Sequence, residues 1–197
     1  MIKAILFDFG GVLAEEGFKN GLQAIARKQG FDPDLFFALA RDLVYATGYV
    51  TGLADEKAYW KALKEAAGFE TEDAPLRREI LDRFILRPEM TDLAQELKKR
   101  GLVVGILSDQ TDWLEELDQK HHFLRYFDPV FNSFRLHKGK NDPSLFLDVS
   151  KILGFDPEEI LFIDDNPENL KRAASKKWRT ILFRDPEQVR KDLEKFF

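Results

Sequence analysis

Five short runs of consecutive apolar residues place the strongest constraint on how this chain folds. They do not alternate with polar residues, which is the pattern of strands buried on both faces of a sheet. The runs, of which the third is the weakest, are residues 2–7, 102–107, 129–132, 160–163 and 180–183. Helical patterns separate the last four runs, so the sequence predicts a doubly wound parallel α/β sheet with helices on both faces.

Proline and glycine mark the expected helix boundaries. Pro88 can occupy the first position of a helix whose apolar residues repeat at helical spacing until Gly101 ends it. Asp-Pro or Asn-Pro pairs are predicted to begin later helices, because the short polar side chain caps free amides and proline fixes the first turn. These pairs lie at 142–143, 156–157, 166–167 and 185–186.

The segment between the first two strands does not follow this alternation. It contains only helical patterns, at residues 22–29, 33–45, 55–67 and 75–84. We therefore expect a small helical cap, residues 14–86, inserted into a core formed by residues 1–13 and 87–197. Most aromatic residues of this insertion are expected to pack within it, and the exceptions that could contact a ligand are Tyr45, Tyr49 and Trp60.

Composition excludes several classes of protein. A hydrophobic fraction of 44% with 18 Phe is ample for a packed core, but no apolar run approaches the roughly 18 to 20 residues that span a bilayer. The absence of Cys excludes disulfides and thiol chemistry. With a net charge of -5 and no dense basic tract, neither nucleic acid nor a membrane is expected as a partner. We expect a cytoplasmic protein, of an oligomeric state that the sequence does not reveal.

Polar residues follow three of the predicted strands. Asp8 follows the first strand, Ser108-Asp109 follow the second, and Asp164-Asp165 close the fourth. Ligands of open α/β sheets bind beyond the carboxyl ends of the strands, where the strand order reverses. Carboxylates gathered there repel one another and need a cation, and Mg²⁺ is the hard ion that prefers oxygen ligands. The sequence therefore predicts a magnesium site.

These residue types support phosphoryl transfer. Asp8 is the candidate nucleophile, because a carboxylate can attack phosphorus and form an aspartyl-phosphate. Gly10 and Gly11 would let the backbone approach the phosphate and present amides to it. The Ser108 hydroxyl could donate to a phosphate oxygen, and Lys140 could neutralise the transferring group.

Each candidate also has a purely structural interpretation. Ser108 and Asp109 could cap the helix that follows, and Asp164-Asp165 could reinforce a helix start. Lys140 could be a solvated loop lysine, and spacing alone does not separate it from Lys138.

The motifs in this order resemble those of the haloacid dehalogenase-like hydrolase superfamily over essentially the whole chain. They are FDFGGVL at 7–13, LSDQ at 107–110, KNDPSLF at 140–146 and FIDDNPENL at 162–170. The third motif favours Lys140 over Lys138, although Asn141 stands where proline is usual. The insertion is similar to the type of cap that sits between the first motif and the second strand. With glycine at position 10 and the sequence Arg-Pro-Glu at 87–89, the chain resembles most the sugar-1-phosphatase-like branch of this superfamily.

The resemblance implies a magnesium-dependent phosphatase that hydrolyses a small phosphorylated metabolite through an aspartyl-phosphate. A sugar phosphate is one candidate substrate. Asp8 would be nucleophile and metal ligand, Gly10 a ligand through its carbonyl, and Asp165 would complete the site with Asp164 as ligand or outer partner. Ser108 and Lys140 would act in catalysis and hold the phosphate. The remaining expected substrate-binding residues are Gly10, Gly11 and Asp109.

Gly10 departs from the family pattern. Most family phosphatases carry an aspartate two residues after the nucleophile, as general acid and then base, and such catalysis contributes about 10²–10⁴-fold. Its loss implies a good leaving group, a mediating water, a substitute residue or weak activity. Glu15 and Glu16 follow soon after and could lean back towards the site.

Two other functions stay open at this stage. A protein that binds a phosphorylated ligand or a partner without turnover would explain Gly10. A 2-haloacid dehalogenase, in which Asp8 attacks carbon, would need no metal, but the pair Asp164-Asp165 counts against it. Metal dependence separates the dehalogenase from the phosphatase.

Overall fold

The computed structural model, which covers residues 1–197, has a five-stranded parallel sheet at its centre. Its strands are β1 (Ala4–Phe7), β2 (Val103–Ser108), β3 (Val130–Asn132), β4 (Ile160–Asp164) and β5 (Arg179–Leu182). All five predicted strands are present, including the short third one. The predicted strand ends differ from the observed ones by a few residues at most. The apolar runs reflect which residues are buried, and burial does not stop at the exact end of a strand.

The strand order β3-β2-β1-β4-β5 places β1 in the middle of the sheet. Phe7, the last residue of β1, lies between Ile106 of β2 and Ile163 of β4. The chain first builds β2 and β3 on one side of β1, and then crosses to build β4 and β5 on the other. This reversal opens a crevice at the carboxyl ends of β1 and β4, where ligands bind in open α/β sheets.

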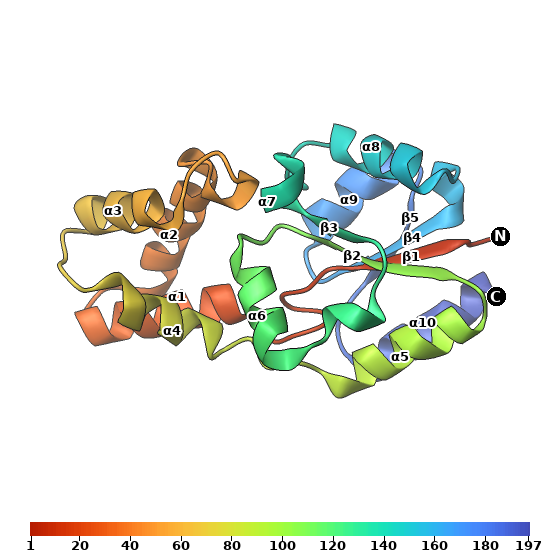
Figure 1. Ribbon diagram of the computed structural model, residues 1–197, viewed down its shortest axis with the longest axis horizontal. Coiled ribbons are helices and arrows are strands. Elements are labelled where there is room, and N and C mark those ends of the chain that lie inside the picture. Colours follow the sequence, from red (N-terminus) through yellow and green to blue (C-terminus); the bar gives the residue numbers. More distant parts are fainter.

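Helices cover both faces of the sheet, as Figure 1 shows. On one face lie α5 (Pro88–Lys99) and α10 (Pro186–Leu193), and on the other lie α8 (Ser144–Leu153) and α9 (Pro167–Ser175). Every residue of β1 is buried, and its side chains pack alternately into the apolar cores on the two faces of the sheet. The alternation of polar and apolar residues that marks a half-exposed strand is therefore absent. The predicted α/β fold class is therefore confirmed.

The remaining elements are short, and one of them, the 3₁₀ turn at Tyr49–Thr51, belongs to the segment inserted between β1 and β2. They are α6 (Trp113–His121), α7 (Ser133–Leu136) and the 3₁₀ turns η1 (Tyr49–Thr51), η2 (Leu124–Tyr126), η3 (Pro157–Glu159) and η4 (Glu194–Phe196). Of the four predicted proline starts, two begin helices: at α9 Asn166 accepts the Glu168 N–H, and at α10 Asp185 accepts the Gln188 N–H. The pair at 156–157 begins only the 3₁₀ turn η3, and α8 begins at Ser144, one residue after Pro143. None of the helices combines the length and the apolar character that crossing a membrane requires.

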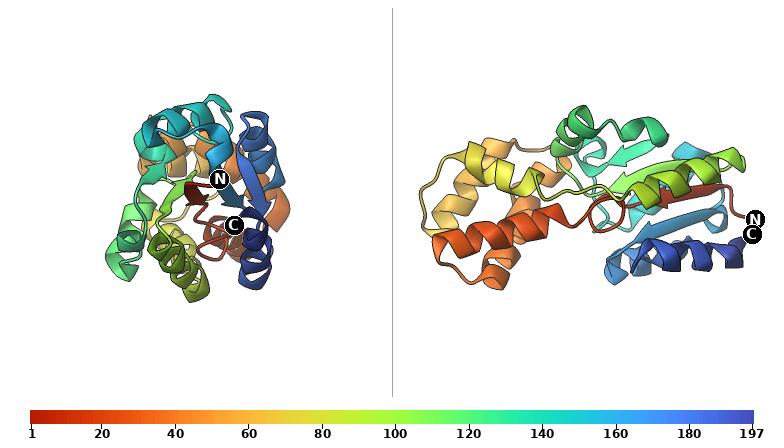
Figure 2. Two further views of the ribbon diagram at one scale, coloured as in Figure 1. Left: turned by 90° about the vertical axis from the view of Figure 1, so that its right-hand side faces the viewer. Right: turned by 90° about the horizontal axis from the view of Figure 1, so that it is seen from below.

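Four helices between β1 and α5 form a separate bundle beyond the carboxyl ends of the strands (Figures 1 and 2). They are α1 (Gly17–Gln29), α2 (Pro33–Ala46), α3 (Glu56–Ala67) and α4 (Asp73–Leu81). Both chain termini lie at the opposite end of the molecule (Figure 2). Helix α1 begins at Gly17, earlier than predicted, because the Glu16 side chain accepts the Lys19 N–H at 3.2 Å and caps it.

The bundle packs against α6 through aromatic side chains. The ring of Trp113, at the start of α6, lies 6.1 Å from that of Trp60 and 5.8 Å from that of Tyr49. The Tyr49 hydroxyl also donates to Asp112 at 2.6 Å. Tyr49 and Trp60 are fully buried, so these two candidates for ligand contact are core residues instead. One continuous apolar core thus joins the bundle to the sheet.

We predict that Trp113→Ala lowers the free energy of unfolding by about 3–5 kcal/mol, because it empties the junction between bundle and sheet. Urea titration followed by circular dichroism would measure the change. Leu35→Ala is the control, since Leu35 is 74% exposed on α2. A loss for Trp113→Ala no larger than the control's would show that the junction adds little to stability.

Candidate active site

A buried lysine lies at the centre of the strand-end cluster. Lys140, in the loop between α7 and α8, places its Nζ 2.7 Å from an oxygen of Asp8 and 2.7 Å from one of Asp164. Burial alone would lower the pKa of Lys140, but the charges of Asp164, Asp8 and Asp109 together raise it well above its usual value. Lys140 is therefore a permanent cation within the site.

Asp109 holds the loop that carries this lysine. Its carboxylate accepts the main-chain N–H of Lys140 at 2.8 Å and the hydroxyl of Tyr45 at 2.8 Å. Burial raises the pKa of Asp109, although the charge of Lys140 opposes the shift. Asp109 does not cap α6, whose first flanking residue is Asp112. Instead it ties the Lys140 loop to α2, and Tyr45 is the one predicted aromatic exception that reaches the site.

Lys138, the alternative lysine, lies outside the cluster. Its Nζ donates to Asp148 at 2.6 Å and to Ser144 at 2.9 Å, both on α8. The structure therefore brings together Lys140, and not Lys138, with the strand-end carboxylates.

The two adjacent carboxylates at the end of β4 have different surroundings. Asp164 is fully buried, and besides Lys140 it accepts the Asn166 N–H at 2.7 Å and the Asn169 side-chain amide at 3.1 Å. Asp165 faces the loop after β1. A Cβ atom on Gly11 would lie 2.2 Å from the Asp165 carboxylate, and Gly11 has φ +82°. Gly11 is thus required both for its backbone conformation and for the close approach of Asp165.

Asp8 completes a cluster of three carboxylates. Burial raises the pKa of Asp8 well above its usual value, and although Lys140 opposes this shift, the charge of Asp164 adds to it. Ser108 is buried at the end of β2 and lines the same cavity as Asp8. Asp8, Asp164 and Asp165 each offer an oxygen within 4.8 Å of the others. One lysine does not balance three carboxylates, and the oxygen-only donor set fits a hard divalent cation such as Mg²⁺.

Arg87 positions the loop between Asp8 and α1, a role that no sequence motif predicted. Its guanidinium donates to the main-chain oxygens of Gly11, Val12 and Ala14 and pairs with Glu15 at 3.1 Å. Arg87 and the loop after Asp8 are far apart in the sequence. The position of Arg87 just after the insertion is therefore the one signal that could have indicated this role.

Gly10 does not have the left-handed conformation found at Gly11. A Cβ atom on Gly10 would lie 3.3 Å from Oε2 of Glu16 and 3.4 Å from the ring of Phe84. Burial raises the pKa of Glu16 above its usual value. The space beside Gly10 is therefore bordered by the carboxylate of Glu16 and the ring of Phe84, and not only by backbone atoms.

A cavity of about 410 Å³ lies between the strand ends and the bundle. Asp8, Ser108, Lys140 and Asp165 line it from the sheet side, together with Gly10 and Asp109. Helices α1 and α2 supply the opposite wall, which includes Phe18, Lys19, Phe37 and Arg41. The cavity therefore combines an acidic floor containing one lysine with a wall that is aromatic and cationic.

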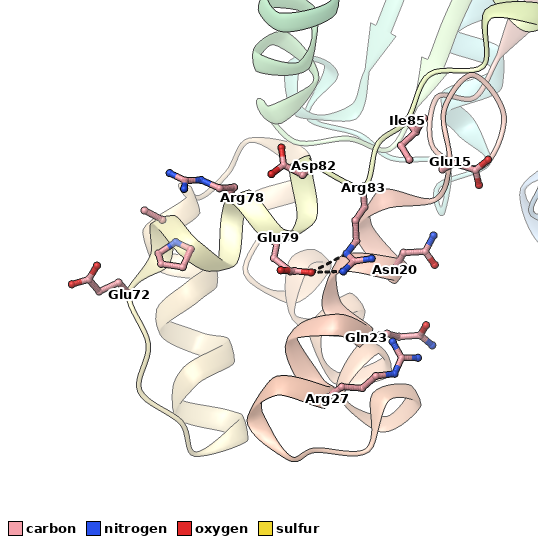
Figure 3. A pocket seen from close by; sticks show the side chains of 12 residues that line it. Glu15, Asn20, Gln23, Arg27, Glu72, Arg78, Glu79, Asp82, Arg83 and Ile85 are labelled. Carbon is pink, nitrogen blue, oxygen red and sulfur yellow. Dashed lines mark hydrogen bonds and ion pairs between the residues drawn. The ribbon is translucent and has the colours of Figure 1, made fainter.

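A larger cavity of about 840 Å³ lies elsewhere, on the outer side of the bundle between α1 and α4 (Figure 3). Charged side chains line it, and Glu79 pairs with Arg83 at the C-terminal end of α4 on one wall. None of the predicted site residues belongs to this cavity. The strand-end cavity, although smaller, is the one that holds the reactive groups.

A doubly wound sheet with an acidic, lysine-containing cavity at its point of reversal defines an enzyme of the Rossmann-like α/β class. The chain belongs to the haloacid dehalogenase-like hydrolases, whose family model matches residues 2–175.

Curated relatives include two kinds of enzyme. Enolase-phosphatase E1 of Aquifex aeolicus is 26% identical over 207 residues, which cover 92% of this chain and 89% of the relative. Bifunctional epoxide hydrolase 2 is 32% identical in Rattus norvegicus, over 57% of this chain and 21% of the relative. The Sus scrofa protein of the same name is 26% identical, over 98% of this chain and 38% of the relative. The chain therefore spans well under half the length of these epoxide hydrolases.

Solved structures show the same fold. A haloacid dehalogenase family enzyme of Bacteroides thetaiotaomicron, in complex with magnesium and inorganic phosphate, has a TM-score of 0.69 and is 25% identical. The match covers 93% of this chain and 95% of that one. The L-2-haloacid dehalogenase of Xanthobacter autotrophicus, with chloropropionic acid covalently bound, has a TM-score of 0.67 at 22% identity, covering 91% and 76%. At that identity the second match shows the fold alone.

We predict that Lys140→Met lowers the free energy of unfolding by about 3–5 kcal/mol, because it leaves Asp8 and Asp164 buried without their cation. Lys138→Met is the matched control, and it should shift the unfolding midpoint much less because the Lys138 pair is solvated. Urea titration of both variants would measure the difference. Equal shifts would mean that Lys140 is not the cation on which the cluster depends.

Proposed function

We propose that the protein is a magnesium-dependent phosphatase that hydrolyses a small phosphorylated metabolite, a sugar phosphate being one candidate, through an aspartyl-phosphate on Asp8. The observation that carries the proposal is the cation Lys140 held between Asp8 and Asp164, with Asp165 beside them, in a cavity open to a small ligand. The similarity to an enolase-phosphatase and to a structure that holds magnesium and phosphate supports it.

Each residue has a defined task in this reaction. An oxygen of Asp8 attacks phosphorus, and the bond from phosphorus to the leaving oxygen breaks. Lys140 holds Asp8 in place and compensates the charge on the transferring group, and Ser108 donates its hydroxyl to a phosphate oxygen. Water then attacks the phosphorus of the aspartyl-phosphate, which releases inorganic phosphate and restores Asp8.

Asp8 and Asp165 are the residues proposed to hold the metal directly. The oxygens of Asp164 are already engaged by Lys140, Asn166 and Asn169, so Asp164 acts as the outer partner that orients the lysine. When bound, Mg²⁺ would supply positive charge to the phosphate oxygens.

We further propose that residues 14–86 act as a cap over the core formed by residues 1–13 and 87–197. Helices α1 and α2 supply one wall of the cavity, so the substrate is enclosed between the two parts. Phe37 contacts both Lys19 and Arg41, whose charged groups lie 5.6 and 5.9 Å from its ring centre. This wall favours a substrate whose remaining part is polar or anionic.

The site favours the phosphatase over the dehalogenase. The metal-free reaction of a dehalogenase gives the Asp165 carboxylate next to Asp8 no role. A metal site, in contrast, uses the carboxylates of both Asp8 and Asp165 as ligands. The non-catalytic alternative depends on Gly10, and turnover measurements decide it.

We predict that Asp8→Asn lowers phosphate release by about 10³-fold or more, because the neutral amide is no longer a nucleophile. The assay would use p-nitrophenyl phosphate and a panel of sugar 1-phosphates, with magnesium and with chelator. Asp148→Asn, on the outer face of α8, is the control and should retain activity.

Other results of the same assays would point to the dehalogenase or to the non-catalytic binding protein. Release that survives both the chelator and Asp8→Asn would contradict the proposal. Metal-free halide release from a 2-haloacid would indicate the dehalogenase, and phosphate binding with no turnover of any ester would indicate the binding protein.

A further inference from the structure

An uncatalysed step remains in the reaction proposed above. When the bond from phosphorus to the leaving oxygen breaks, that oxygen takes the electron pair and needs a proton unless it is a stable anion. The later attack of water on the aspartyl-phosphate needs a group that removes a proton from the water. Asp8 performs neither task, because its carboxylate is consumed as the nucleophile. Gly10, which borders the cavity next to Asp8, has no side chain.

Most titratable groups in the cavity are already engaged. Lys140 is held by two carboxylates, and Asp109 accepts both the Lys140 N–H and the Tyr45 hydroxyl. Asp165 is proposed to hold the metal, and the neighbouring Asp164 is fully buried, does not line the cavity and accepts three donors. These groups are therefore not free to exchange a proton with the leaving oxygen.

Glu16 is the acidic side chain that is left. It lines the same cavity as Asp8, and its Oε2 is the atom nearest to the missing side chain of Gly10, at 3.3 Å from the Cβ position. Its other oxygen, Oε1, accepts the Lys19 N–H at 3.2 Å and caps α1. This cap fixes one oxygen and leaves the other beside Gly10, with the ring of Phe84 on the same side.

Position 10 and Glu16 share one space. A Cβ atom at position 10 would lie 3.3 Å from the Glu16 carboxylate, which is closer than an ordinary van der Waals contact. Glycine at this position therefore makes room for Glu16, which means that the lack of a side chain at position 10 is not a simple loss of function.

We propose that Glu16 is the general acid and base of the phosphatase reaction. In the first step, the protonated Glu16 gives its proton to the leaving oxygen as the phosphorus–oxygen bond breaks, which releases a neutral alcohol. In the second step, the Glu16 carboxylate takes a proton from the attacking water, the bond between phosphorus and Asp8 breaks, and Glu16 is protonated again. The inference rests on the phosphatase function proposed above.

The neighbouring Glu15 provides a matched control. Its carboxylate pairs with Arg87 and borders the outer cavity between α1 and α4 (Figure 3), and it does not line the strand-end cavity. Two consecutive glutamates thus face different cavities, so Glu15→Gln and Glu16→Gln change the same charge in different places.

The test compares kcat/KM for p-nitrophenyl phosphate and phenyl phosphate, because this parameter reports the step in which the ester bond breaks. Phenyl phosphate has the poorer leaving group and needs the proton more. Glu16→Gln keeps an oxygen that can cap α1 but cannot give a proton. We expect it to lower kcat/KM by about 10²-fold on phenyl phosphate and by less than about 10-fold on p-nitrophenyl phosphate. Glu15→Gln should leave the ratio of the two values unchanged.

The ratio does not depend on the fraction of folded enzyme, so a variant that folds poorly still gives a valid answer. An equal fall on both esters would show that Glu16 only caps α1, and no fall would show that it takes no part; either result overturns the inference. A wild-type enzyme that hydrolyses neither these two esters nor any sugar 1-phosphate of the panel would contradict the phosphatase proposal, and the inference with it.

Discussion

The buried ion pairs of Lys140 are the interaction on which the site depends. Its Nζ joins Asp8 at the end of β1 to Asp164 at the end of β4, across the point where the strand order reverses. Burying these charges costs solvation free energy, and one lysine does not balance the surrounding carboxylates. Such an arrangement is a weak source of stability. It is well suited to a site that gains its remaining positive charge from a bound metal.

The segment from Asp8 to Glu16 links this cluster to the helical bundle. Arg87 holds its carbonyl oxygens, and Ala14 bridges to Leu86, so the segment that enters the bundle and the one that leaves it lie side by side. Glu16 ends the segment and begins α1. The bundle is therefore anchored within a few residues of the proposed nucleophile, and any movement of α1 would change the position of Glu16 relative to Asp8.

Much of the fold followed from local patterns. The five strands were predictable because burial on both faces leaves no polar alternation, and α9 and α10 begin at predicted Asn-Pro and Asp-Pro pairs because these pairs satisfy free amides locally. The early start of α1 was missed because its cap is a glutamate, which is not among the preferred capping residues. The location of Tyr45 beside Asp109 was left open, since helical periodicity does not show which aromatic residue meets another part of the chain.

The sequence by itself determined the family, the sheet and the set of polar residues at its edge, because strand burial and motif spacing are properties of short segments. The tertiary structure placed Lys140, which the third motif already favoured, between the carboxylates, and it alone decided which aromatic residue of the bundle reaches the site and what occupies the space beside Gly10. Those answers depend on side chains from distant loops converging at one edge of the sheet. Such convergence is set by the packing of the whole molecule, and no local pattern records it.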